Sequence, residues 1–276
     1  MFHISTVEKG VKFMKVSICS HRPLLTPCTL EDFEFQLDPY IGCTHNCHYC
    51  YALNQAETDW SNEIQIHRDI VEQLNHELAE IPPQNIYIGW NADSYQQSEI
   101  TYNQTRRVLE LLLEKGFSVT ILTKSDLIVR DIDLLKKMKN ASVGISFAFN
   151  EETRPIFEGN TICNNARLTA LSKLKEAGID TYAMICPVFP YITDIKSLIN
   201  ILTPHSNAIW IYSLSMIGHS DLNWLNTQAI LQSHFPELKE RIEAAAFLPQ
   251  HPYWIELRED LEKLRTEKQV PLKICL

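Results

Sequence analysis

The sequence lacks several features that would place it in a membrane-bound or modular class. It has no apolar run long enough to span a bilayer and no secretory pattern near its start. It also has no internal repeat and no low-complexity linker. We therefore expect a cytoplasmic protein without a membrane partner, folded as one large domain or as one domain with an appendage.

Positive charge is also scarce. The chain has 25 basic and 34 acidic residues, which gives a formal net charge of −9. Such a balance provides no general attraction to a phosphate backbone or an anionic membrane, although it leaves room for a local basic groove. Because duplex binding draws much of its affinity from lysine and arginine contacts to phosphates, the composition disfavours duplex DNA as a partner.

Cysteine is distributed unevenly along the chain. Three thiols lie in one short run with CxxxCxxC spacing, Cys43-Thr44-His45-Asn46-Cys47-His48-Tyr49-Cys50. The others are scattered, as in a reduced cytoplasmic protein: they are Cys19, Cys28, Cys163, Cys186 and Cys275.

Three thiols this close can turn toward a common centre, where thiolates bind soft metals and iron–sulfur clusters. Because a four-iron cubane usually takes four cysteines, three ligands predict a cluster with one iron open to another molecule. Two other interpretations are a zinc knuckle with His45 or His48 as the fourth ligand, and unligated core thiols. From another class, a non-catalytic zinc protein or a redox-sensing iron–sulfur protein also fits the cysteines.

The order of expected elements predicts the fold. Residues 33–38 alternate apolar and polar as in a half-buried strand, and the cysteine run follows it. Further strands are expected at 86–89, 117–122, 143–147, 181–185 and 208–212, separated by helices near 70–78, 105–115, 131–139, 168–177 and 194–202.

This alternation predicts an α/β fold with a parallel sheet and right-handed crossovers, a partial (β/α)6 barrel. Chemistry in such barrels lies at the carboxyl ends of the strands, where the cysteine run falls. We expect an amino-terminal extension over 1–30, the barrel over 31–215 and a helical cap over 216–276. In that cap, helices are expected at 222–235, 236–245 and 254–268, and a strand or tail at 269–276.

The cysteine spacing, with the aromatic Tyr49 before the last thiol, resembles the radical S-adenosylmethionine (SAM) superfamily. The resemblance implies that SAM chelates the open iron of a [4Fe-4S] cluster. An electron from the cluster then cleaves SAM to a 5′-deoxyadenosyl radical, which abstracts a hydrogen from the substrate. It also implies a flavodoxin- or ferredoxin-type reductant as a partner.

Several stretches are similar to the spore photoproduct lyase-like branch of this superfamily, over roughly 33–194. They are Asp38 to Cys43, Tyr49 to Ala52, Asp93 to Gln96 with Glu99, Leu122 to Ser125, Arg130 to Leu135 and Ala183 to Pro190.

The resemblance implies roles for individual residues. Cys43, Cys47 and Cys50 would ligate the cluster, and Tyr49 would pack near the adenine. Lys124 would meet the SAM carboxylate in a charge-assisted contact, unless it is a solvated lysine. Gly89 and Asn91 would hold the amino group of SAM, although the usual Gly-Gly-Glu pattern is missing there. Ser146 would contact the ribose, unless it faces a helix. Main-chain groups around Pro187 would hold the adenine.

The substrate side departs from the lyase pattern. True lyases carry a hydrogen-donor cysteine at the end of the second strand, where this chain has Trp90 to Asp93. Tyr49 and Tyr51 match the tyrosines that return the hydrogen atom in the lyases. Cys186 is either a hydrogen donor or a buried structural cysteine. Photoproduct repair is therefore a disfavoured alternative, and the substrate is a nucleic-acid base, a peptide or a small molecule. Asp93 and Glu99 either bind SAM or substrate or cap the next helix.

Overall fold

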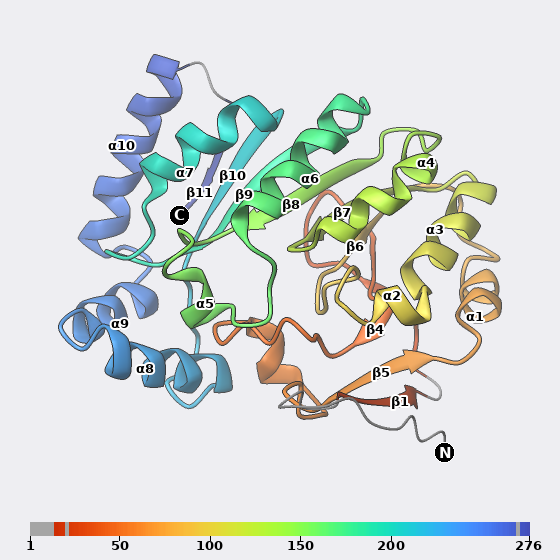
Figure 1. Cartoon of the computed structure of the whole chain (residues 1–276), viewed down its shortest axis with the longest axis horizontal. Helices are drawn as coiled ribbons and strands as arrows, with labels where there is room; N and C mark the ends of the chain where they lie inside the picture. The colour runs from red at the N-terminus through yellow and green to blue at the C-terminus, as the bar shows by residue number, and fades with distance from the viewer. Residues whose placement is uncertain (1–13, 20–21, 269–270) are drawn as a thin grey trace.

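The computed structural model describes residues 14–19, 22–268 and 271–276. The main element is an eight-stranded sheet in the order β11-β10-β9-β8-β7-β6-β3-β2, flanked by helices (Figure 1). From β3 to β11 neighbouring strands are parallel, whereas β2 is antiparallel to β3. The strands are β2 Leu25–Pro27, β3 Phe35–Leu37, β6 Asn85–Ile88, β7 Ser118–Thr123, β8 Ser142–Phe147, β9 Asp180–Val188, β10 Ala208–Ser213 and β11 Leu272–Cys275.

The six strands predicted from the sequence are β3 and β6 to β10, and the partial-barrel prediction is confirmed. Within the described residues the edge strands β2 and β11 do not pair, so the sheet is an open barrel rather than a closed one. The helices between the strands are α1 Ile70–Glu77, α2 Glu99–Tyr102, α3 Gln104–Glu114, α4 Ile132–Leu135, α5 Arg154–Phe157, α6 Asn164–Glu176 and α7 Ile195–Leu202. None of the helices in the described part of the chain is long and apolar enough to cross a membrane.

Local sequence explains where these helices form and end. In α3, Val108, Leu109 and Leu112 recur at helical spacing and are fully buried. Gly116 and Gly178 follow α3 and α6 with positive φ, the backbone conformation that ends a helix most easily at glycine. The helix expected over 131–139 is shorter than predicted, because the 3-10 helix η2 Asp126–Asp131 precedes α4.

A second, three-stranded sheet was not predicted. It has the order β1-β5-β4, with β1 Lys15–Cys19, β5 Glu63–His67 and β4 Tyr40–Ile41. These strands are short, and β1 pairs with β5, which is far away in the sequence. The local pattern of apolar and polar residues therefore does not predict them. The amino-terminal extension therefore contains strands; its residues 1–13 lie outside the described part.

The carboxyl-terminal region contributes both helices and a strand. Its helices are α8 Leu222–His234, α9 Lys239–Phe247 and α10 Pro252–Lys268. The strand expected over 269–276 is confirmed as β11, although residues 269 and 270 are outside the described residues. Because β11 pairs in parallel with β10, it widens the main sheet, and α10 runs beside it (Figure 1). The division into extension, barrel and cap stays a prediction.

A glycine on β8 makes room for an aromatic ring inside the sheet. A Cβ atom at Gly144 would overlap the ring of Tyr182 on the neighbouring strand β9. That ring is fixed, because it stacks on Trp210 at 4.6 Å and its hydroxyl donates a hydrogen bond of 3.3 Å to the carbonyl of Ile121. The position therefore tolerates no side chain without a shift of the sheet.

We predict that Gly144→Ala lowers the free energy of unfolding by about 1–3 kcal/mol, because overpacking a filled core forces side chains off their preferred rotamers. Urea unfolding would measure this. The matched control is Gly159→Ala, where the nearest atom to the new methyl group is a carbonyl oxygen 3.7 Å away. The control should stay within about 0.5 kcal/mol of the wild type. Equal stability of the two variants would contradict the packing argument.

Candidate active site

The cysteine run forms a loop between β4 and the 3-10 helix η1 (Tyr51–Gln55), beside the carboxyl end of β3. Two amide side chains hold the start of the loop. Gln96, which is fully buried, accepts a hydrogen bond from the main-chain nitrogen of Thr44 at 2.8 Å and donates one to the carbonyl of Gly42 at 2.9 Å. Asn160 donates a hydrogen bond of 3.0 Å to the carbonyl of Thr44.

A cavity of about 350 Å³ lies at the carboxyl ends of the barrel strands. Residues that lie far apart in the sequence, and that were each proposed as site residues, meet there. Of the candidate residues named from the sequence, Glu99 does not line the cavity. The candidates that line it are Cys43, Cys47, Tyr49, Cys50, Tyr51, Gly89, Asn91, Asp93, Lys124, Ser146, Cys186 and Pro187.

The three loop thiols are a donor set suited to a cluster. Burial raises the pKa of Cys43 to about 12, and it raises the pKa of Cys47 and Cys50 as well. The thiols therefore stay protonated until a metal displaces their protons. Among the described residues no three cysteine, histidine or acidic side chains are grouped to hold one metal ion, so the zinc knuckle has no preformed site there. Cluster ligands bind separate irons and need not converge on one atom.

Asp93 connects the cysteine loop to the end of β7. Its side chain is 8% exposed and lies 3.1 Å from the Nε2 atom of His45. It accepts hydrogen bonds of 2.7 Å from the Thr123 hydroxyl and from the main-chain nitrogen of Lys124. Burial alone would raise the pKa of Asp93, but His45 and these donors hold it well below its ordinary value. Asp93 therefore lines the cavity as a carboxylate.

Glu99 serves a different purpose from Asp93. Its buried carboxylate accepts hydrogen bonds from the main-chain nitrogens of Thr105 at 2.9 Å and Arg106 at 3.1 Å, in the first turn of α3. It also pairs with Arg130 at 2.6 Å. Of the two interpretations of Glu99, helix capping is confirmed.

Lys124 stands at the carboxyl end of β7 with its ammonium 5.9 Å from the centre of the Tyr49 ring. Burial opposes its charge, but the neighbouring Cys47 sulfur and the Glu158 carboxylate hold the pKa of Lys124 above its ordinary value. Lys124 is therefore a cation on the cavity wall.

Behind Tyr49 lies a buried ionic network that the sequence did not predict. The Tyr49 hydroxyl donates to Glu158, which pairs with Arg167 at 2.7 Å; both charged side chains are 0% exposed. Arg167 also donates to the carbonyl of Ser146 at 2.9 Å, at the carboxyl end of β8. The network ties the cysteine loop to the barrel wall. One signal was present, since Arg167 falls in helical register with the buried Leu171 and Leu174.

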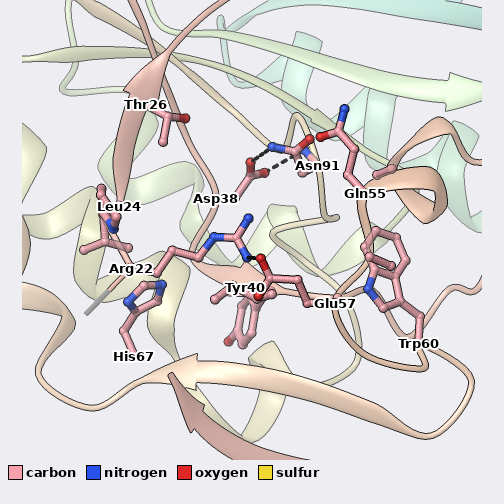
Figure 2. A pocket seen from close by; sticks show the side chains of 15 residues that line it. Arg22, Leu24, Thr26, Asp38, Tyr40, Gln55, Glu57, Trp60, His67 and Asn91 are labelled. Carbon is pink, nitrogen blue, oxygen red and sulfur yellow. Dashed lines mark hydrogen bonds and ion pairs between the residues drawn. The ribbon is translucent and has the colours of Figure 1, made fainter. Parts of the chain in front are cut away.

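The segment after β6 is held from behind by Asp38. Its carboxylate accepts hydrogen bonds from the main-chain nitrogen and side-chain amide of Asn91, at 3.0 and 2.9 Å, and from the nitrogen of Ala92 at 3.2 Å. Figure 2 shows this pair beside a smaller hollow of about 80 Å³, near the 3.4 Å ion pair of Arg22 and Glu57. The side-chain amide and the main-chain nitrogen of Asn91 are thus both engaged by Asp38.

Gly89 precedes this segment and requires glycine. Its φ is +91°, and a Cβ atom there would lie 2.6 Å from the carbonyl of Leu122. The close approach of the two strands at the cavity floor depends on the missing side chain.

His219 is not among the residues that line the cavity. It stacks on Phe247 with ring centroids 3.8 Å apart and pairs with Glu243 at 3.2 Å. Its contacts belong to the packing of the carboxyl-terminal helices.

With the fold and cavity described, comparison with known proteins gives the class. Residues 37–200, more than half of the chain, match the Radical SAM superfamily. The chain therefore belongs to the radical SAM superfamily of enzymes, a family that implies an iron–sulfur cluster and SAM.

Two uncharacterized proteins are among its relatives in sequence. One, from Methanocaldococcus jannaschii, is 27% identical over 232 residues, covering 82% of this chain and 86% of that protein. The other, from Mycobacterium tuberculosis, is 30% identical over 198 residues, covering 67% and 58%. The chain thus spans less than two thirds of the mycobacterial relative.

Solved structures share the fold at low sequence identity. A spore photoproduct lyase variant superposes with a TM-score of 0.58 at 16% identity, covering 80% of this chain and 66% of the lyase. SuiB of Streptococcus suis, bound to SAM, gives 0.57 at 13% identity, covering 88% and 50%.

We predict that Asp38 makes stability depend on pH. Burial raises the pKa of Asp38 to about 6. The native state therefore keeps this proton to higher pH than the unfolded chain, and this group's contribution to stability falls as pH rises from about 4 to 6. Asp38→Asn removes this pH-dependent contribution to stability, because asparagine does not titrate. Relative to wild type, its free energy of unfolding should rise by about 2 kcal/mol between pH 4.5 and 7.5, measured by urea unfolding. Parallel pH curves for the two proteins would contradict the assignment.

Proposed function

We propose that the chain is a radical SAM enzyme that holds a [4Fe-4S] cluster through Cys43, Cys47 and Cys50 and abstracts a hydrogen atom from its substrate. The observation that carries the proposal is the meeting of three loop thiols, two of them buried and Cys50 partly buried, with the Lys124 cation on one cavity at the strand ends. When bound and reduced by a flavodoxin- or ferredoxin-type partner, the cluster would supply the electron that cleaves SAM to a 5′-deoxyadenosyl radical.

The chain's own residues would bind and orient SAM. The Lys124 ammonium suits the carboxylate of SAM, since charge-assisted hydrogen bonds are among the strongest available to a protein. Main-chain groups of Gly89 and Asn91 would hold the amino group of SAM, and the Ser146 hydroxyl would contact its ribose. The adenine would pack between Tyr49 and the main chain near Pro187. Their shared position on one cavity supports these roles.

The walls of the same cavity would exclude water and place the substrate. Cys186, at the carboxyl end of β9, lies where a thiol could return a hydrogen atom to a product radical, and Tyr51 lines the same space. Solved relatives of the fold include a lyase bound to a dinucleoside spore photoproduct and SuiB bound to a precursor peptide. We propose a nucleic-acid base, a peptide or a small molecule as the substrate. The tryptophan at the end of β6 argues against lyase-type repair.

The cluster assignment predicts a specific loss. After anaerobic reconstitution with iron and sulfide, the wild type should show a four-iron electron paramagnetic resonance (EPR) signal that SAM perturbs, and it should form 5′-deoxyadenosine. Alanine at Cys43, Cys47 or Cys50 should abolish both while circular dichroism stays native. The matched control is Cys163→Ala, which removes an exposed thiol and should retain both.

Three outcomes would contradict this proposal. If a variant of Cys43, Cys47 or Cys50 kept the full cluster and cleaved SAM, that cysteine would not be a cluster ligand. Wild-type protein that binds one zinc ion tightly, takes up no cluster and does not bind SAM would favour the non-catalytic zinc interpretation. A cluster that forms without any SAM cleavage would favour a redox sensor.

Lys124→Met should weaken SAM binding about 10- to 100-fold, because a charge-assisted hydrogen bond contributes about 1.5–3 kcal/mol. The dissociation constant can be read from the change in the cluster's EPR signal during a SAM titration. The cluster content should stay at the wild-type level, which separates a SAM contact from a folding defect. Lys263→Met, at an exposed site on α10, is the control. Wild-type affinity in Lys124→Met would favour a merely solvated lysine.

A further inference from the structure

Three oxidisable aromatic rings run in contact from the cysteine loop into the barrel. The centre of the Tyr51 ring lies 5.7 Å from that of Trp90, and the centre of the Trp90 ring lies 5.6 Å from that of Tyr87. Tyr51 directly follows Cys50, whereas Trp90 and Tyr87 come from the end of β6. All three rings line the cavity, so they connect its reactive end with its floor.

The two ends of this row differ in exposure. Tyr51 is 44% exposed and faces the open cavity, whereas Tyr87 is 2% exposed. Beyond Tyr87 the next ring is Phe33, at 5.3 Å. Tyrosine and tryptophan lose one electron far more easily than phenylalanine does. The oxidisable part of the row therefore begins beside the cluster loop and ends in the core.

Polar groups lie beside both ends of the row. The Tyr51 hydroxyl donates a hydrogen bond to the main-chain carbonyl of Trp90. Tyr182 is a close neighbour of Tyr87, and the Tyr182 hydroxyl donates a hydrogen bond of 3.3 Å to the carbonyl of Ile121. The inner end of the row therefore borders a second tyrosine.

The next ring beyond Tyr182 is poorly suited to carry a radical further. Tyr182 stacks on Trp210, and the ammonium of Lys273 lies 4.2 Å from the centre of the Trp210 ring. A cation over an aromatic face is attracted by its electrons, so removing an electron from that ring becomes harder. This charge sets the inner limit of the row at Tyr87 and Tyr182.

We propose that Tyr51, Trp90 and Tyr87 form a redox chain that gives a hydrogen atom to a radical in the cavity when no substrate is present. The inference rests on the proposed function, because the oxidant is the 5′-deoxyadenosyl radical. When SAM has been cleaved without substrate, this redox chain moves the unpaired electron away from C5′ and the cluster loop.

The first step of the redox chain is a hydrogen-atom transfer from the Tyr51 phenol to the C5′ radical. The phenol O–H bond breaks and a C–H bond forms at C5′, which gives 5′-deoxyadenosine and a tyrosyl radical. Trp90 then loses one electron and its indole proton while Tyr51 regains one of each. Tyr87 restores Trp90 in the same way. A low-potential electron donor of the kind that reduces the cluster, with a proton from solvent, finally restores Tyr87.

The test uses the full chain with its cluster reduced and the excess reductant then removed. SAM is added without substrate, samples are frozen, and EPR spectra and 5′-deoxyadenosine are measured on the same samples. Parallel preparations carry ring-deuterated tyrosine or ring-deuterated tryptophan. We expect 5′-deoxyadenosine together with an organic radical whose hyperfine structure narrows with each label.

The variants follow from the geometry. Trp90→Phe keeps an aromatic ring between its neighbours and keeps the Tyr51 hydrogen bond, because the acceptor is a main-chain carbonyl. It should confine the radical to Tyr51 and abolish the effect of labelled tryptophan. Tyr87→Phe should shift the signal toward tryptophan. Tyr253→Phe is the control, since Tyr253 packs on Tyr191 at 4.8 Å and is not among the cavity-lining residues; its spectrum should match wild type.

The outcomes separate the two proposals. If 5′-deoxyadenosine forms without any aromatic radical, or with the same spectrum in Trp90→Phe and Tyr87→Phe as in wild type, the redox chain is wrong and the enzyme assignment stands. If no 5′-deoxyadenosine forms and SAM leaves the cluster signal unchanged, the proposed function itself is wrong. The redox chain then has no oxidant and is wrong as well.

Discussion

The carboxylate of Asp93 is the contact on which the arrangement of the cavity depends. It is the shared acceptor for His45 of the cysteine loop and for two groups at the end of β7, the Thr123 hydroxyl and the Lys124 nitrogen. A loop of irregular backbone is thereby fixed to a strand whose position the parallel sheet sets. Because an ionised carboxylate in a poorly hydrated place needs several donors, losing any one of them would destabilise the others.

A second buried charge system supports the cavity around Tyr49. Glu158 compensates Arg167, accepts a hydrogen bond from the Tyr49 hydroxyl and lies within electrostatic reach of Lys124. Fully buried charges are tolerated only when they are paired and hydrogen-bonded, and here each is. The cysteine loop is therefore attached to the barrel at two of its residues, His45 through Asp93 and Tyr49 through Glu158.

Sequence reasoning recovered the barrel because each parallel strand is a short apolar run followed by an amphipathic helix. It also placed the site residues at one cavity, since the carboxyl ends of parallel strands meet at one edge of the sheet. It missed β1, β4 and β5, whose pairing joins short distant segments. It missed the role of Glu158 because one partner of its carboxylate is Tyr49, far along the chain, and no local pattern encodes that contact.

The pairing of β11 with β10 bears on how the protein is made. Until residues 272–275 leave the ribosome, β10 is an edge strand with a row of unpaired main-chain groups, and such edges invite pairing with other chains. Trp210 and Tyr212, which line the cavity from β10, gain Lys273 and Cys275 as strand partners only when β11 pairs. Pairing of β11 is therefore the step that protects the β10 edge of the sheet from aggregation.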